Sequence, residues 1–312
     1  MGGIDLHTHL APHLDLDDGR PSPPALYDPA ALDTWLDAHN LDGSAVSAPP
    51  PFYRQYLSAD AAGDWVRSLN DGVLAAVGAH DRLVPLGYLP MEHPSVAVAE
   101  MERLIHIPEL GGFTACAGGR SGALDADGLE PLWARLDEVE LPVFLHPGQS
   151  PDRRLDRFYL ANLLGNPYET AVAAAQLLLG DVLGRHPNLR IVLAHCGGAV
   201  PATLGRWERG IATNRPGLIE LSRPLSEALR GIWVDCLAYE QGLVDLAIRR
   251  FGLDRVVLGS DWPFPMGLDD PVAAVQHLGA DAVRQIGVKN VRSLVADAPA
   301  WRVLVSACER PR

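Results

Sequence analysis

Histidine and aspartate residues at separated points in the chain could together bind a divalent metal ion. His7 and His9 are one residue apart, so on an extended strand both imidazoles project from the same face and can reach one ion. His146, His195 and Asp261 each end a further run of strand type. Imidazole and carboxylate groups suit Zn²⁺, with Fe²⁺, Co²⁺ or Mn²⁺ as alternatives. A single histidine at a strand end is more often a hydrogen-bonded structural residue, so the argument depends on convergence of the whole set.

Eight short β-type runs, each followed by a stretch of helical periodicity, could bring these residues together. Such alternation predicts a parallel sheet, because parallel neighbours need a crossover connection. Eight units in 312 residues fit a (β/α)8 TIM barrel better than a doubly wound sheet, and no G-x-G-x-x-G phosphate turn follows the first run. Pro85 counts against the third run, since proline removes a hydrogen-bond donor. The runs are residues 4–7, 44–47, 84–88, 112–116, 143–146, 190–195, 231–236 and 255–261, and one of the helices predicted between them covers residues 169–185.

A barrel of this kind gathers the carboxyl ends of its strands around one mouth, where active sites lie. We therefore expect the histidines and Asp261 to meet there. The prediction is a single α/β domain over residues 1–312, with a polar, acidic, proline-rich loop insertion at about residues 11–29.

The composition favours a small-molecule partner. The chain is 47% hydrophobic and 21% charged, which is enough apolar sequence for a large core. Its formal net charge of −13 argues against a nucleic acid or an anionic membrane surface as partner. An acidic substrate would then need local positive charge from a metal ion or an arginine.

The cysteines and the amino terminus predict a cytoplasmic protein. The four cysteines are far apart and include no C-x-x-C pair, which favours reduced thiols. No basic and apolar leader precedes Asp5, and no apolar run approaches the ~18 residues that a membrane span needs. The cysteines are Cys116, Cys196, Cys236 and Cys308.

Several motifs resemble those of the amidohydrolase superfamily, in the branch that contains 2-amino-3-carboxymuconate-6-semialdehyde decarboxylase and related nonoxidative decarboxylases. The resemblance covers nearly the whole chain, and its last two segments are specific in combination. The matching segments are residues 4–9, 89–91, 146–147, 167–170, 194–201 and 259–267.

The resemblance implies a metal site held by His7, His9, His146 and Asp261. It assigns His195 as the catalytic acid/base, which would pass a proton from water at the metal to the substrate carbon, with Asp261 also orienting it. The superfamily often places a carboxylated lysine at the end of the fourth strand when two metals bind. Cys116 and the residue after it occupy that place here, which favours one ion, with Zn²⁺ preferred.

The implied reaction is nonoxidative decarboxylation of a small unsaturated or aromatic carboxylic acid, without an organic cofactor. The alternative is hydrolysis of a lactone or an amide, since the same metal centre can stabilise a tetrahedral oxyanion. A metal-containing barrel that only binds or regulates is a third possibility, although His195 would then have no reason to accompany the ligands.

Substrate recognition is expected to use arginine, whose planar fork matches a carboxylate. By the resemblance, Arg206 reaches the active site of a neighbouring subunit and makes a homodimer the functional unit, whereas an exposed helix arginine is the alternative. A second family arginine has no counterpart except Arg20. Phe158 lies near a family pocket aromatic, with core packing as the alternative, and Trp262 could line the mouth or simply pack.

Overall fold

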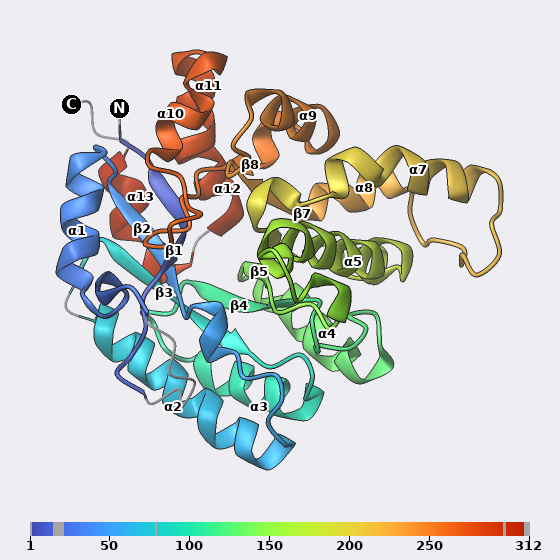
Figure 1. Cartoon of the computed structure of the whole chain (residues 1–312), viewed down its shortest axis with the longest axis horizontal. Helices are drawn as coiled ribbons and strands as arrows, with labels where there is room; N and C mark the ends of the chain where they lie inside the picture. The colour runs from blue at the N-terminus through green and yellow to red at the C-terminus, as the bar shows by residue number, and fades with distance from the viewer. Residues whose placement is uncertain (1, 15–21, 79, 296–297, 309–312) are drawn as a thin grey trace.

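The computed structural model describes residues 2–14, 22–78, 80–295 and 298–308. Eight parallel strands form one sheet in the order β1 to β8, surrounded by helices (Figure 1). This arrangement confirms the predicted (β/α)8 barrel. The strands are β1 (Ile4–His9), β2 (Gly43–Ser47), β3 (Leu83–Leu89), β4 (Gly112–Ala117), β5 (Val143–Pro147), β6 (Ile191–Leu193), β7 (Ile232–Asp235) and β8 (Val256–Val257).

The barrel closes where β1 pairs with the residues that follow β8. Isolated parallel bridges join Asp5 to Leu258 and Thr8 to Trp262. The backbone N–H of Leu6 donates to the carbonyl of Leu258 at 2.9 Å. Strand β8 is short, but the segment after it runs beside β1 as far as Trp262, which brings Asp261 next to the paired histidines of β1.

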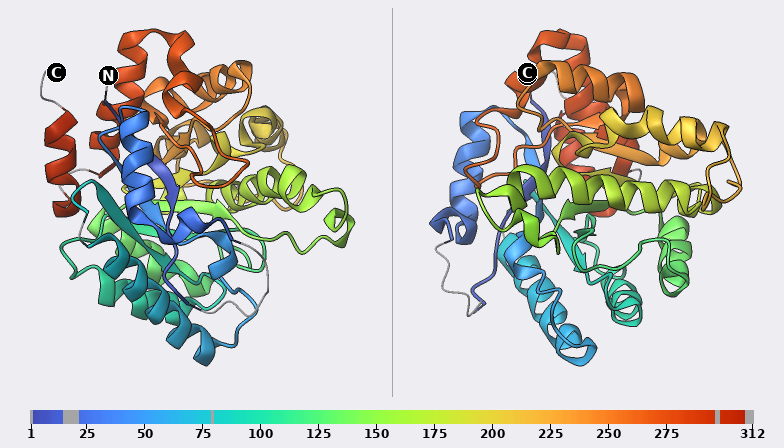
Figure 2. Two further views of the ribbon diagram at one scale, coloured as in Figure 1. Left: turned by 60° about the vertical axis from the view of Figure 1, so that its left-hand side comes forward. Right: turned by 45° about the vertical axis from the view of Figure 1, so that its right-hand side comes forward.

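Helices cover the outside of the sheet (Figures 1 and 2). The segment 169–185, predicted as one helix, is divided at Gly180 and Asp181, where Asp181 has a left-handed backbone with φ 61°. The larger helices are α1 (Pro29–Ala38), α2 (Ala59–Val77), α3 (Pro94–Leu104), α4 (Glu130–Val139), α5 (Asn166–Leu179), α7 (Val200–Ala212) and α9 (Gln241–Phe251). The shorter ones are α6 (Val182–Arg185), α8 (Leu225–Ala228), α10 (Pro271–Val275), α11 (Ala280–Arg284), α12 (Asn290–Val295) and α13 (Arg302–Cys308).

Side-chain alternation along the strands separates the barrel interior from the helix-packed exterior. On β5, Val143 and Leu145 belong to the large core that packs against the surrounding helices, whereas Phe144 belongs to a second buried group. The rings of Phe144 and His7 lie 4.8 Å apart. Because residues two apart share a strand face, the same alternation directs His146 into the interior above Phe144.

Pro85 does not interrupt β3, so the expectation that it weakens this strand is wrong. It pairs in register with Val46 of β2, and its carbonyl accepts a hydrogen bond from the Gly111 N–H at 2.9 Å. Pairing between β3 and β4 begins only at Leu86 and Gly112. The missing N–H therefore faces the chain ahead of β4, where a ladder bond is not needed.

Part of the predicted loop insertion lies outside the described residues, namely residues 15–21. Its described part contains a short 3-10 helix, Pro24–Tyr27, and the Ala11 N–H donates to the Leu26 carbonyl at 2.7 Å. Within the described residues, no helix combines the length and apolar character that crossing a membrane requires.

Candidate metal centre

Five polar side chains meet at the carboxyl ends of the strands, which we call the mouth. His7 and His9 come from β1, His146 from β5, His195 from the turn after β6, and Asp261 from the segment after β8. Four of them, His7, His146, His195 and Asp261, offer ligand atoms that all lie within 4.8 Å of one another. The His9 Nε2 atom is 3.0 Å from Asp261 Oδ1. We call these five residues the histidine–aspartate cluster.

Asp261 is the common neighbour of the four imidazoles. Its Oδ1 atom lies 3.3 Å from His7 Nε2 and 3.9 Å from His146 Nε2. Its Oδ2 atom lies 3.8 Å from His195 Nε2. The ring nitrogens therefore converge on one carboxylate, as the sequence predicted from strand ends alone.

Hydrogen bonds on the far side of the rings fix the tautomers of His7 and His146. His7 Nδ1 lies 2.7 Å from Asp235 Oδ2, and His146 Nδ1 lies 3.0 Å from the Pro147 carbonyl. A carboxylate and a carbonyl can only accept, so each Nδ1 carries the proton and each Nε2 keeps its lone pair. Histidine ligands of metals are oriented in this way.

His9 is held in the same manner by β2. Its Nδ1 atom lies 3.0 Å from the Ser47 hydroxyl, which itself donates to the Thr8 carbonyl at 3.3 Å. Ser47 therefore accepts the Nδ1 proton, and the Nε2 lone pair of His9 faces Asp261. The aromatic ring of Phe264 lies 5.4 Å from that of His9 and covers one side of it.

The cluster fits a divalent cation. The Nε2 atoms of His7 and His146 are buried and have no hydrogen-bond partner among the described residues. Nitrogen lone pairs that face a carboxylate repel it unless positive charge lies between them. Three imidazoles and a carboxylate are also the ligand types that a divalent transition metal accepts. The residues present thus fit a divalent metal site.

Burial and neighbouring charges shift the pKa values of the cluster residues. Burial opposes a charge on His7, but Asp261 and Asp235 outweigh it and raise the pKa of this imidazole to about 10. Burial and the neighbouring imidazoles hold the pKa of His146 well below its usual value, so it stays neutral. Burial alone would raise the pKa of Asp261. The charge on His7 and the hydrogen bonds that Asp261 receives from the imidazoles hold that pKa well below its ordinary range. Without an ion, His7 is therefore protonated and balances the charge of Asp261, and a divalent ion would have to displace that proton to bind the His7 imidazole.

His195 differs from the other three imidazoles. Its Nδ1 atom is buried and has no hydrogen-bond partner within the described part of the chain. It lies in a turn whose backbone is left-handed, with φ 55° at both His195 and Cys196. The N–H groups of these two residues donate to Asp235 at 2.9 and 2.7 Å. The backbone of His195 is therefore fixed, while its ring is not committed to one tautomer.

No lysine lies at the end of β4. Cys116 occupies that position, fully buried, with its thiol 3.5 Å from the Gly118 carbonyl. The chain has a single lysine, Lys289, and this residue is exposed in the π-helix Gln285–Lys289. A carboxylated lysine that bridges two ions is thus excluded.

Residues predicted to bind substrate lie outside the cluster. Arg206 is exposed on α7 and has no hydrogen-bond or ion-pair partner among the described residues, while Arg20 falls outside them. Phe158 is 75% exposed, with the Arg157 guanidinium 4.8 Å from its ring, so its interpretation as a core residue is wrong. Trp262 is half-buried and lies 6.4 Å from the ring of Trp35 in α1, which is a packing contact.

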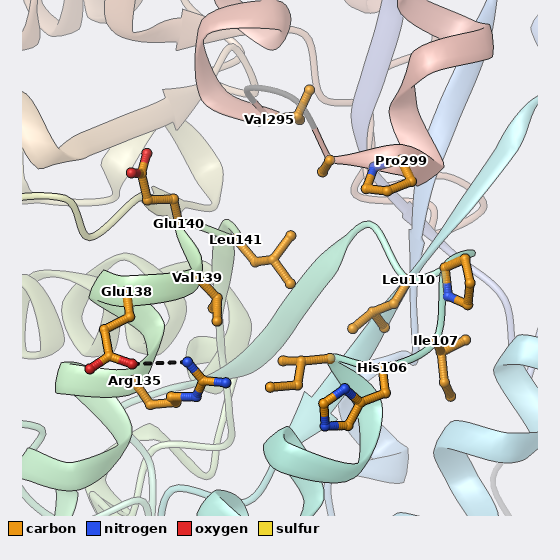
Figure 3. Close-up of a pocket in the computed structure, with 13 residues that line it drawn as sticks. His106, Ile107, Leu110, Arg135, Glu138, Val139, Glu140, Leu141, Val295 and Pro299 are labelled. Atoms are coloured by element: carbon orange, nitrogen blue, oxygen red, sulfur yellow. Dashed lines mark hydrogen bonds and ion pairs between the residues drawn. The ribbon is translucent and has the colours of Figure 1, made fainter.

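The pocket in Figure 3 is separate from the mouth. It has a volume of about 670 Å³ and is lined by the segments that precede β4 and β5, including Leu110 and Leu141, and by Pro299. Arg135 and Glu138 form an ion pair at its edge. These segments lie at the amino ends of the strands, the end of a TIM barrel that serves stability rather than chemistry.

Comparison with known proteins agrees with this geometry. A family model described as amidohydrolase matches residues 4–295. The chain belongs to the amidohydrolase family. Over 245 residues it is 30% identical to 2-amino-3-carboxymuconate-6-semialdehyde decarboxylase of Dictyostelium discoideum. This match covers 77% of this chain and 68% of that protein. It is also 30% identical over 252 residues to gamma-resorcylate decarboxylase of Rhodococcus jostii, covering 73% of this chain and 75% of that protein.

A solved decarboxylase structure has the same fold. The dihydroxybenzoic acid decarboxylase of Polaromonas sp., solved with bound manganese and the inhibitor 2-nitroresorcinol, superposes with a TM-score of 0.80. The match has 22% sequence identity and covers 94% of this chain and 96% of that one.

Proposed function

We propose that this amidohydrolase removes CO2 from a small unsaturated or aromatic carboxylic acid at one divalent ion, with His195 as the proton donor. The chain is a metal-dependent nonoxidative decarboxylase, as its relatives at 30% identity are decarboxylases. Hydroxylated benzoic acids are the substrates we favour, because two of the similar proteins are named for gamma-resorcylate and dihydroxybenzoic acid.

The proposal is supported by the different hydrogen bonds at the Nδ1 atoms of the four imidazoles. His7, His9 and His146 each have Nδ1 hydrogen-bonded and direct an Nε2 lone pair at Asp261, and these four residues are the proposed ligands. His195 has no partner on Nδ1 among the described residues, so either ring nitrogen can carry a proton. This freedom suits general acid–base catalysis. The alternative ligand set replaces His9 with His195.

Decarboxylation leaves an electron pair on carbon, and the site has the groups to manage it. A divalent ion held there supplies positive charge that attracts the oxygens of the acid and stabilises developing negative charge. His195 donates a proton to the ring carbon that carries the carboxylate. The carbon–carboxylate bond then breaks, its electrons restore the ring, and CO2 leaves, so one proton replaces one CO2. Asp261 Oδ2 lies 3.8 Å from His195 Nε2 and can orient this ring toward the substrate.

Hydrolysis of a lactone or an amide is the alternative reaction on this scaffold. It would use the same cluster, with a water molecule as the attacking group and His195 as the base. The decarboxylase identity of the 30%-identical relatives favours loss of CO2 instead.

Zn²⁺ is the metal that we favour, because imidazole ligands with one carboxylate are typical of catalytic zinc. Mn²⁺ is the second candidate, since it is bound in the Polaromonas enzyme. The proposed reaction needs no organic cofactor, because the carbon is protonated before CO2 leaves and a bound cation would stabilise the negative charge on the oxygens of the acid.

A homodimer would complete the site. Arg206 is exposed and has no hydrogen-bond or ion-pair partner within the described part of one chain, and we assign it to the carboxylate of a substrate bound by the other subunit. Helix α7 and the loop after it project from the barrel (Figure 1), where a second subunit can be reached. Exposed apolar side chains in the β5–α5 connection and at the start of α5 offer surface for such contact; they are Phe158, Tyr159, Leu163, Leu164 and Tyr168.

Further substrate contacts are assigned at the mouth. Arg20, which lies outside the described residues, is the proposed second carboxylate-binding residue. Phe158 and Trp262 are proposed to border the substrate, with Phe158 buried only when a second subunit is present. The cytoplasm is the proposed location, supported by four cysteines that form no disulfide.

Product analysis tests the proposal. Enzyme loaded with Zn²⁺ or Mn²⁺ is incubated in D2O with 2,6-dihydroxybenzoate and a panel of hydroxylated benzoates and unsaturated dicarboxylates. We expect stoichiometric CO2 and a product with one deuterium at the former carboxylate carbon. His195→Asn should keep its metal and lose about 10²- to 10⁴-fold in kcat. Full turnover by this variant, or product formed by addition of water, would contradict the assignment.

A further inference from the structure

A single buried carboxylate contacts both a proposed metal ligand and the turn that carries the proposed proton donor. Asp235 ends β7 and is fully buried. Its Oδ2 atom accepts from His7 Nδ1 at 2.7 Å and from the His195 N–H at 2.9 Å. Its Oδ1 atom accepts from the N–H groups of Cys196 at 2.7 Å and Leu237 at 3.0 Å. All four contacts are to protein groups, so Asp235 acts through its neighbours.

The turn that Asp235 holds has an unfavourable backbone. His195 and Cys196 are followed by Gly197 and Gly198, and all four residues have positive φ between 55° and 75°. Residues with a Cβ atom rarely adopt this conformation. Charge-assisted hydrogen bonds from both non-glycine N–H groups to Asp235 oppose that cost. Without the carboxylate, the backbone of His195 would relax and move its imidazole away from the cluster.

The fold leaves space for Asp235 to reach His7. Gly259 lies against the pair, and a Cβ atom added there would be 2.6 Å from the Cβ of Asp235 and 2.9 Å from that of His7. Such distances are shorter than van der Waals contact. A glycine on the segment after β8 thus lets three neighbouring segments approach closely enough for the carboxylate–imidazole contact.

We propose that Asp235 is a positioning residue that couples metal binding to the placement of His195. By accepting the Nδ1 proton it keeps the Nε2 lone pair of His7 available to the ion, and through the same oxygen it fixes the His195 backbone. This inference rests on the proposed metal-dependent function. It predicts that loss of one carboxylate impairs both the ion site and the proton donor.

Titration of metal-free protein with Mn²⁺ tests the first half of the coupling. In Asp235→Asn an amide NH2 can replace Oδ2 and donate to His7 Nδ1, which moves the ring proton to Nε2. We expect Mn²⁺ binding to weaken about 10- to 100-fold. Asp5→Asn is the matched control, because Asp5 is also fully buried but accepts from the backbone N–H groups of His7 and Ser260, at 2.9 and 3.1 Å, and is hydrogen-bonded to no imidazole among the described residues. Equal Mn²⁺ affinities for the two variants would overturn the proposal.

A measurement on the unaltered protein covers the case in which Asp235→Asn fails to fold. In ¹⁵N-histidine-labelled, Zn²⁺-loaded protein, the His7 Nδ1–H bonded to a carboxylate should give a strongly downfield proton signal. This signal should persist in Asp5→Asn. A His7 ring with no proton on Nδ1 would refute the proposal without any Asp235 variant.

Kinetics at saturating Mn²⁺ test the second half. With the ion site filled, Asp235→Asn should still lower kcat at least tenfold while KM changes less than threefold, because the His195 turn is displaced. A fully restored kcat would refute the coupling. The Mn²⁺ titration and the proton signal require no substrate, so a failure of the proposed decarboxylation would be recognised separately from a failure of this inference.

Discussion

Ser47→Ala decides whether His9 belongs to the ligand set. Ser47 lies in β2, is buried, and accepts the His9 Nδ1 proton at 3.0 Å. Removal of its hydroxyl takes the acceptor at 3.0 Å from a fully buried N–H donor and leaves it only the Ser47 backbone, which costs about 1–3 kcal/mol. The ring avoids this cost by moving the proton to Nε2, and it can then no longer bind a metal. Since about 1.4 kcal/mol corresponds to a tenfold change in affinity, metal binding should weaken about 10- to 100-fold.

Mn²⁺ titration by calorimetry measures this effect, with Ser44→Ala as the matched control. Ser44 is a buried serine of the same strand, but its hydroxyl contacts the Thr8 hydroxyl at 2.7 Å and the Asp5 carbonyl at 3.0 Å, and no imidazole. Both variants should lose some stability against unfolding, and only Ser47→Ala should lose Mn²⁺ affinity. If Ser47→Ala binds Mn²⁺ within threefold of the control, His9 is not a ligand and His195 takes its place.

Three further outcomes are expected. Chelation of an ion present at about 1,000 times its Kd should lower the free energy of unfolding by about 4 kcal/mol. For a chain of this length the Tm should then fall by about 6 °C. An unchanged Tm in calorimetry would count against a metal bound by the folded state. Mixing inactive His195→Ala and Arg206→Ala subunits should restore about one quarter of the wild-type kcat. Half of the dimers are then mixed, and each mixed dimer has one intact site of its two. No recovery would show that Arg206 does not act in the active site of the partner subunit. Burial raises the pKa values of the thiols of Cys116, Cys196 and Cys236, so at pH 8 they remain protonated and iodoacetamide should modify only half-buried Cys308, as counted by mass spectrometry.

The sequence predicted the barrel and the convergence of its histidines because both depend on local patterns. Short apolar runs form buried parallel strands, and a polar residue directly after such a run must appear at the mouth. His146 and Asp261 could be found in this way without knowledge of any partner. The roles of Asp235 and Ser47 could not, because their imidazole partners are 228 and 38 residues away. An aspartate that ends a strand has no sequence signal of its own for such a contact.

Loop geometry limited the remaining predictions. Phe158 and Tyr159 both have left-handed backbones, with φ 57° and 58°, a conformation that aromatic residue types do not indicate. Their exposure therefore could not be inferred from hydrophobicity. The helix predicted over residues 169–185 is divided because Asp181 accepts two hydrogen bonds from Ser222, which is 41 residues further along the chain. Tertiary contacts of this kind override local helical preference.

The junction between β1 and β8 gives the ion a mechanical role in addition to its chemistry. Backbone pairing there consists of isolated bridges, yet His9 and Asp261, which face each other across it, are 252 residues apart in the sequence. A cation shared by these two side chains cross-links nearly the entire polypeptide into a ring, and links that enclose the longest segments restrict the unfolded chain the most. Loss of the ion should therefore open the cylinder along this junction first, and the exchange of amide hydrogens in β1 should accelerate before that in β4 or β5.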